Sequence, residues 1–234
     1  MADFNAIIKA LLRQKSASVS SDGSEARLRA SRRQQLMTVN WKHELVTAGK
    51  VWRTTVGTIT GGGDVNPVTG GGNGTTVDQD QPEVAIGVDS GYYLIPLEIK
   101  VAAHVDLDAD ADDGDIIAAV DRSAGVPTSV TGTIETPTNQ LDGGASFPGR
   151  AFSAITGDIT DPTVDEILDH VHVQGGAAGT PGNLAVAQLK MDYRAEWPDL
   201  IAGPCGLYVY WGGVAAVNAV ASVVVAAVES DWFE

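Results

Sequence analysis

Six aspartates within ten residues form the densest group of side chains in this sequence that could bind a cation. Alternate carboxylates, such as those of Asp106, Asp108 and Asp110, can share a calcium ion. The EF-hand pattern fails, because Ala111 stands where glycine is required and Ile117 where glutamate is required. We therefore interpret the run as a solvated acidic turn between two strands, and keep Asp106, Asp108 and Asp110 as weak metal candidates.

Two of the four histidines, His170 and His172, have a spacing that a metal ion can use, because alternate residues of a strand project from one face. No third ligand is evident nearby in the sequence, so we interpret them as ordinary surface histidines. The glycine-rich runs 61–63 and 70–72 lack the phosphate-loop pattern, and no nucleophile-elbow motif is present. We expect no enzymatic activity and no cofactor.

Cys205 is the only cysteine, which excludes an internal disulfide and a cysteine-based zinc site. It lies between Pro204 and Gly206 in a Gly-Pro-Cys-Gly sequence that predicts an exposed turn. Any disulfide would have to join another chain, and the alternative is a free, partly buried thiol. Both alternatives remain open at this point.

The charge is distributed unevenly along the 234 residues, whose formal net charge is −15. Residues 1–53 hold ten basic and four acidic residues, whereas residues 54–234 hold five basic and 26 acidic residues. A basic arm on an acidic body is typical of a protein whose arm binds an anionic partner or a neighbouring subunit. Acid excess with only six lysines favours a surface kept hydrated in concentrated salt, although an ordinary acidic protein is the alternative.

Residues 3–15 predict an amphipathic helix, and Ser-rich residues 16–24 predict a linker. Such a helix can lie on a membrane, in a partner's groove or on its own domain. Its apolar stripe is too short and too charged for a secretory signal. A cluster of arginines follows, which could contact phosphates, anionic lipids or an acidic subunit. The candidate partner or membrane contacts in the arm, residues 1–35, are Phe4, Ile7, Ile8, Leu11, Arg27, Arg29, Arg32 and Arg33.

Residues 36–234 predict an all-β domain, a sandwich or barrel of the jelly-roll kind, because many short apolar segments alternate with glycine-rich turns. Residues 164–170 could instead form a short helix within this all-β domain. The predicted strands are 36–47, 50–60, 83–88, 92–107, 115–121, 129–136, 150–156, 166–174, 184–197, 206–215 and 219–232.

Trp197-Pro198 ends a long predicted strand, and the aromatic strand 207–211 and the apolar strand 222–228 follow, before a short tail containing Trp232. This last part of the sequence resembles the final strands of viral capsid jelly rolls. With the basic arm and the acidic, lysine-poor body, the chain resembles the small major capsid proteins of tailless icosahedral viruses of halophilic archaea, which enclose an internal membrane.

This resemblance implies a shell of two different single-barrel capsid proteins that form homo- and heterodimers standing on the membrane, with no catalytic residues and no specific nucleic acid. It also implies a virion location, with assembly in the host cytoplasm. The alternative function is a secreted or surface-layer β-sandwich that binds carbohydrate. An enzyme is the third and weakest hypothesis.

Overall fold

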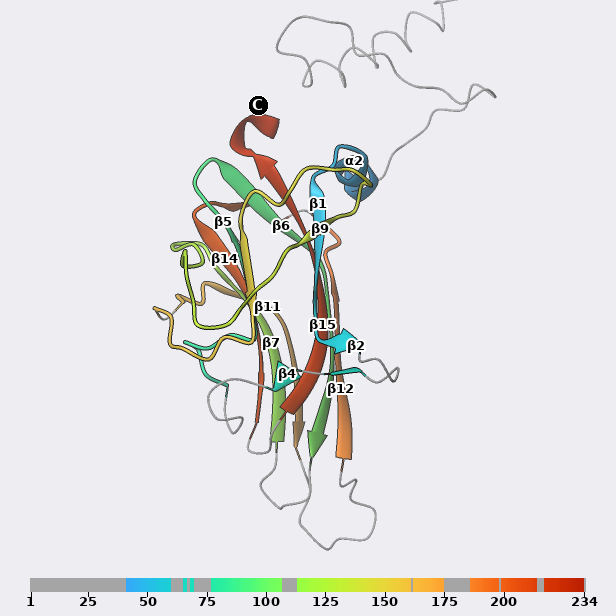
Figure 1. Ribbon diagram of the computed structural model, residues 1–234, viewed down its shortest axis with the longest axis vertical. Helices are drawn as coiled ribbons and strands as arrows, with labels where there is room; N and C mark the ends of the chain where they lie inside the picture. Colours follow the sequence, from blue (N-terminus) through green and yellow to red (C-terminus); the bar gives the residue numbers. More distant parts are fainter. Residues whose placement is uncertain are drawn as a thin grey trace, which may run out of the picture.

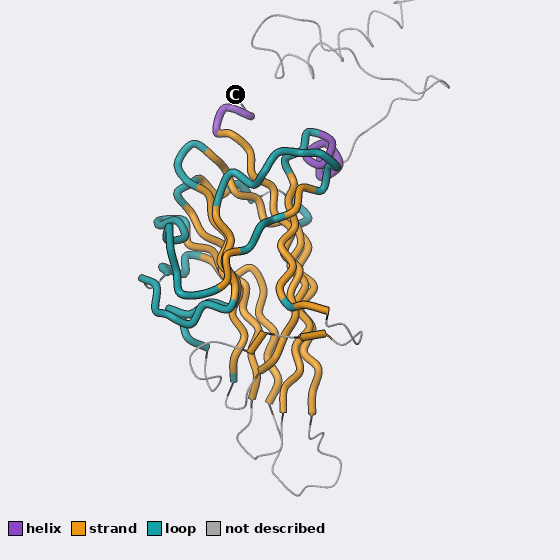
Figure 2. Tube along the Cα trace, in the orientation of Figure 1, coloured by secondary structure: helices purple, strands orange, loops and turns teal. Residues whose placement is uncertain are grey.

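The protein is described by a computed structural model that covers residues 41–59, 65–66, 68–69, 77–106, 113–160, 162–174, 186–197, 199–213 and 217–233. The predicted all-β class is confirmed. Two antiparallel sheets pack face to face as a sandwich (Figures 1 and 2). No helix among these residues has the length and apolar character needed to cross a membrane.

The first sheet contains the longest strands. Its order is β12 (Val186–Arg194), β6 (Tyr92–Asp106), β15 (Val217–Glu229), β1 (Val51–Val56) and β9 (Thr138–Asn139), with β13 (Ile201–Ala202) beside β6 and β4 (Val68–Thr69) beside β15.

The second sheet packs against the first. Its order is β11 (Glu166–Gln174), β7 (Asp113–Asp121), β14 (Cys205–Gly212), β5 (Val84–Val88), β10 (Arg150–Ser153) and β8 (Thr133–Ile134). A separate ribbon pairs β2 (Thr58–Ile59) with β3 (Val65–Asn66).

The side chains of strand β14 are buried on both faces of the second sheet. Leu207, Val209 and Trp211 point into the core between the sheets. Tyr208 and Tyr210 point to the opposite face, where loops cover them, as the teal segments on the left of Figure 2 show. Because both faces are buried, the strand reads as a continuous apolar run and not as an alternating one.

A bulge in β6 allows a proline to lie within a central strand. The pairing with β15 shifts between Val224, opposite Glu98, and Val225, opposite Pro96. Leu97 therefore has no partner residue on β15. Proline, which has no N–H to donate, is tolerated at such irregular positions. The shift also reverses the strand's alternation, so Leu97 faces outward while Ile99 faces the core.

The structure corrects the prediction that residues 36–47 form a strand. Trp41–Thr47 is the helix α2, and residues 36–40 lie outside the described part. Leu45 is buried on the outer face of the first sheet, against a cluster that includes Ile95 and Val224. Gly49 ends the turn after the helix with a φ of 69° and donates its N–H to the Val46 carbonyl, a left-handed conformation that glycine adopts without strain.

Two further expectations also differ from the structure. The possible short helix at 164–170 is wrong, because residues from Glu166 onward pair with β7 as β11. The predicted strand 129–136 is reduced to the two residues of β8, since the rest of that segment is irregular. The chain beyond β15 forms a 3₁₀ turn, η2 (Ser230–Phe233).

Candidate functional site

All of the contact residues predicted in the arm lie outside the described residues: Phe4, Ile7, Ile8, Leu11, Arg27, Arg29, Arg32 and Arg33. Two of the metal candidates, Asp108 and Asp110, also lie outside them. Asp106 is the last residue of β6. Within the part of the chain that the structure describes, no group of three or more His, Cys, Asp or Glu side chains could hold a metal ion.

His170 and His172 lie on one face of β11, as their spacing predicts, and both are about half exposed. They share a single carboxylate from the neighbouring strand: Asp115 Oδ1 lies 2.7 Å from His170 Nε2 and 3.0 Å from His172 Nδ1. The Asp115 carboxylate therefore contacts both imidazole rings across the β7–β11 pair. The half-exposed position of the two rings agrees with their interpretation as surface histidines.

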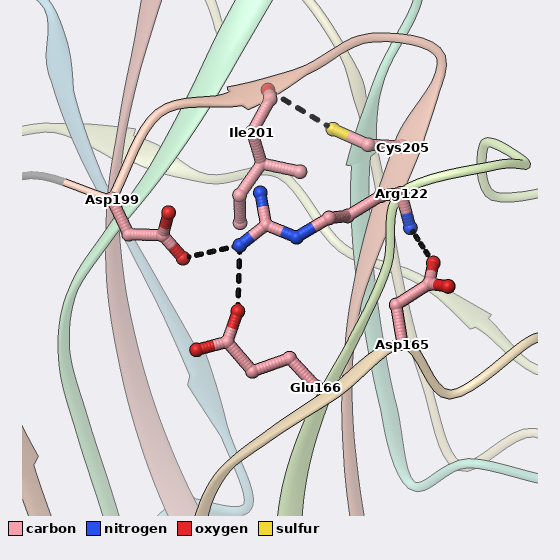
Figure 3. A network of polar contacts seen from close by, with 6 residues as sticks. All are labelled: Arg122, Asp165, Glu166, Asp199, Ile201 and Cys205. Carbon is pink, nitrogen blue, oxygen red and sulfur yellow. Dashed lines mark hydrogen bonds and ion pairs between the residues drawn. The ribbon is translucent and has the colours of Figure 1, made fainter.

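The expectation that Cys205 is exposed is wrong. Its side chain is fully buried at the start of β14, and its thiol lies 3.5 Å from the Ile201 carbonyl, to which it donates (Figure 3). The preceding turn folds inward, since β14 pairs with both β5 and β7 from its first residues. A disulfide to another chain would require this end of the sheet to open, so the structure does not favour the intersubunit bond.

Burial raises the pKa of the Cys205 thiol to about 11, so the reactive thiolate is scarce at neutral pH. We expect the native protein to react with a thiol reagent at least ~100-fold more slowly than the urea-unfolded chain at pH 8. Absorbance of the released chromophore measures both rates. Equal rates, or a dimer band on a non-reducing gel, would contradict a buried thiol.

Arg122 is the centre of a polar network that joins both sheets (Figure 3). Its guanidinium Nη2 donates to Glu166 Oε2 at 2.6 Å and to Asp199 Oδ2 at 2.8 Å. Its backbone N–H donates to Asp165 Oδ2 at 2.6 Å. The hydrogen bond to Glu166 is the main reason that the pKa of Arg122 is raised. The network therefore fixes the end of β7 to the start of β11 and to the segment between β12 and β13.

The turn that carries Arg122 is held by the buried carboxylate of Asp121. Its Oδ1 accepts from the backbone N–H groups of Ser123 and Ala124 and from the Ser123 hydroxyl, at 2.7–2.9 Å. Its Oδ2 accepts from the Thr163 N–H at 2.8 Å. A buried carboxylate with this many donors is well satisfied, and it gives Arg122 a rigid support.

Large apolar side chains are exposed beside this network. Trp197 is 81% exposed and lies two residues before Asp199, and Ile167 is 57% exposed and follows Glu166. Further acids lie next to them in the chain. We call this region the Trp197 surface and define it as Val164, Asp165, Glu166, Ile167, Asp169, Glu196, Trp197, Asp199 and Leu200, with Arg122.

Two carboxylates of the Trp197 surface, those of Glu166 and Asp199, meet at the Arg122 guanidinium. The pKa of Tyr193 is raised first by burial and then by the charges of Asp199, Glu166 and Asp169. Strands β11 and β12 are the end strands of their sheets and contact each other, so this acidic surface lies along one side of the sandwich. Exposed apolar side chains with a polar rim are typical of an interaction site.

The sequence reasoning missed this surface. In the sequence, Trp197 marks only the end of a predicted strand, and the acids at 165–169 and 196–199 belong to the general negative charge. The available signal was the pairing of a tryptophan with nearby acids at a strand end. Nothing in the sequence indicates that residues 122, 166 and 199 meet.

Comparisons with protein-family models, with curated proteins and with solved structures gave no match.

Proposed function

We propose that the sandwich is a jelly roll and that the chain is a major capsid subunit, which self-assembles into an icosahedral shell around an internal membrane. The observation that carries the proposal is the nesting of eight strands in chain order. The first pairs with the eighth (β1–β15), the second with the seventh (β5–β14), the third with the sixth (β6–β12) and the fourth with the fifth (β7–β11). This is the pairing of one long hairpin rolled into two sheets, and jelly rolls of this kind form viral shells.

The charge pattern supports a subunit of an assembly. A basic arm precedes a body with strong acid excess, and such an arm suits contacts with acidic neighbours or anionic lipid headgroups. The proposed partners are other copies of this chain, a second capsid protein and the internal membrane or its proteins. The proposed location is the virion, after assembly in the host cytoplasm, and we propose no catalysis and no cofactor.

A carbohydrate-binding sandwich is the second candidate, and Trp197 is the observation in its favour. Jelly rolls also occur in lectins, and an exposed indole ring offers a flat apolar face on which a sugar ring can stack. In that case the protein would act as a monomer or small oligomer with glycan affinity.

Electron microscopy of negatively stained protein, purified in about 1 M salt, tests the proposal. We expect shells or regular capsomers, alone or after addition of the second barrel protein, and light scattering should show the same species in solution. A particle-free preparation that stays monomeric at every protein concentration would contradict the capsid function. Glycan binding by such monomers, lost in Trp197→Ser, would establish the second candidate instead.

A further inference from the structure

The Trp197 surface combines two features that select a particular kind of ligand. Its carboxylates exceed its cations, since the single charge of Arg122 already faces both Glu166 and Asp199, and Asp165, Asp169 and Glu196 add to the excess. The exposed ring of Trp197 lies among them in the sequence. Carboxylates bind a guanidinium through paired hydrogen bonds, and an aromatic face attracts it by cation–π stacking.

We propose that the Trp197 surface binds the arginine-rich segment, residues 27–33, of a second copy of this chain. The inference rests on the proposed self-assembly and names the contact by which the arm would join neighbouring subunits.

The segment has the chemistry that this surface requires. Residues 27–33 read Arg-Leu-Arg-Ala-Ser-Arg-Arg, with four guanidinium groups and one leucine in seven residues and no acid among them. The guanidiniums match the carboxylates and the indole ring, and the leucine can contact exposed apolar side chains such as Ile167. Residues 54–234 contain only five basic residues, so the body offers no comparable partner.

Other occupants fit this surface less well. Anionic lipid headgroups and nucleic acid phosphates would be repelled by its carboxylates. The eight residues from Arg33 to Trp41 give the segment a reach of up to about 26 Å from the start of α2 when they are extended. We commit to a second copy because an arm bound to its own body would contribute nothing to assembly.

Photo-crosslinking in the full chain tests the contact. A benzoylphenylalanine replaces Leu28, and ¹⁵N-labelled and unlabelled proteins are mixed in low salt, brought to high salt and irradiated. Mass spectrometry then identifies the joined peptides, and light scattering of the same sample records assembly. We expect crosslinks from position 28 to residues 162–169 and 194–200, with labelled and unlabelled peptides joined to each other.

Matched variants separate this contact from a general loss of exposed apolar surface. Trp197→Ser should lower the crosslink yield roughly tenfold, the scale of a cation–π contact. Ile134→Ser should leave it unchanged, because Ile134 is 77% exposed but lies in β8, at the opposite end of the second sheet from β11. Arg32→Glu should also lower the yield, because it replaces a guanidinium with a carboxylate that the acidic surface repels.

The outcomes distinguish this inference from the proposed function. Assembly with crosslinks that map elsewhere, or that join only peptides of one isotope, overturns the contact and leaves the capsid function standing. Crosslinks between copies in small oligomers that never form capsomers or shells support the contact and overturn the capsid function. A monomer without crosslinks overturns both.

Discussion

Replacement of Trp211 by alanine is expected to lower the free energy of unfolding by about 3–5 kcal/mol. Trp211 is completely buried between the two sheets and is among the largest side chains of the core. It lies in β14, where it pairs with Ile116 of β7, and its side chain points into the core, so the cavity would open between the two sheets. Urea unfolding followed by circular dichroism, at one fixed salt concentration, measures the loss.

The matched control is Trp197→Ala, which removes the same side chain from a position that is 81% exposed. We expect this change to alter the free energy of unfolding by no more than about 0.5 kcal/mol. Similar losses in the two variants would contradict the core described here. If Trp211→Ala proves too unstable to purify, Trp211→Phe leaves a smaller cavity and should give a smaller loss in the same direction.

Assemblies of this chain are expected to dissociate when salt falls from about 1 M to about 0.1 M, before the subunits unfold. Residues 54–234 carry a formal charge of −21, and assembly brings such surfaces together. The screening length rises from about 3 Å to about 10 Å over this range, so repulsion between neighbouring subunits grows on dilution. Apolar contacts, which salting-out ions strengthen, then no longer suffice.

A salt dilution series measured by light scattering and by circular dichroism checks this order of events. The scattering intensity should fall at a higher salt concentration than the loss of β-sheet signal. Dilution into an uncharged osmolyte at equal osmolarity is the control, because it does not screen charge. An oligomer that persists at 0.1 M salt would mean that the acidic surface faces only solvent and does not oppose assembly.

The strands were the part of the fold most accessible from the sequence. The segments 92–107, 166–174, 206–215 and 219–232 were predicted close to their observed bounds, because β-branched and aromatic residues recur in them between glycine-rich turns. Periodicity and composition are local properties, and a strand's existence depends largely on them. The charge asymmetry between arm and body is likewise a property of the sequence alone.

Residues 41–47 show where local patterns fail. Their composition suits a strand, yet they form α2 because Leu45 can then be buried on the outer face of the first sheet. The same holds for Cys205, whose neighbours predict an exposed turn but which starts a central strand. In both cases burial against distant residues outweighs local propensity.

The Arg122 network is the clearest case of a feature decided by tertiary structure. Arg122 and Glu166 are 44 residues apart in the sequence, and Arg122 and Asp199 are 77 apart. They meet only because β7 pairs with β11 and the β12–β13 segment passes the same end of the sandwich. The sequence by itself determined the β-rich class and the charge of each region, because these depend on composition and short-range periodicity. Packing of the two sheets decided which acids surround Trp197, because such contacts depend on strand order and register, which local patterns do not specify.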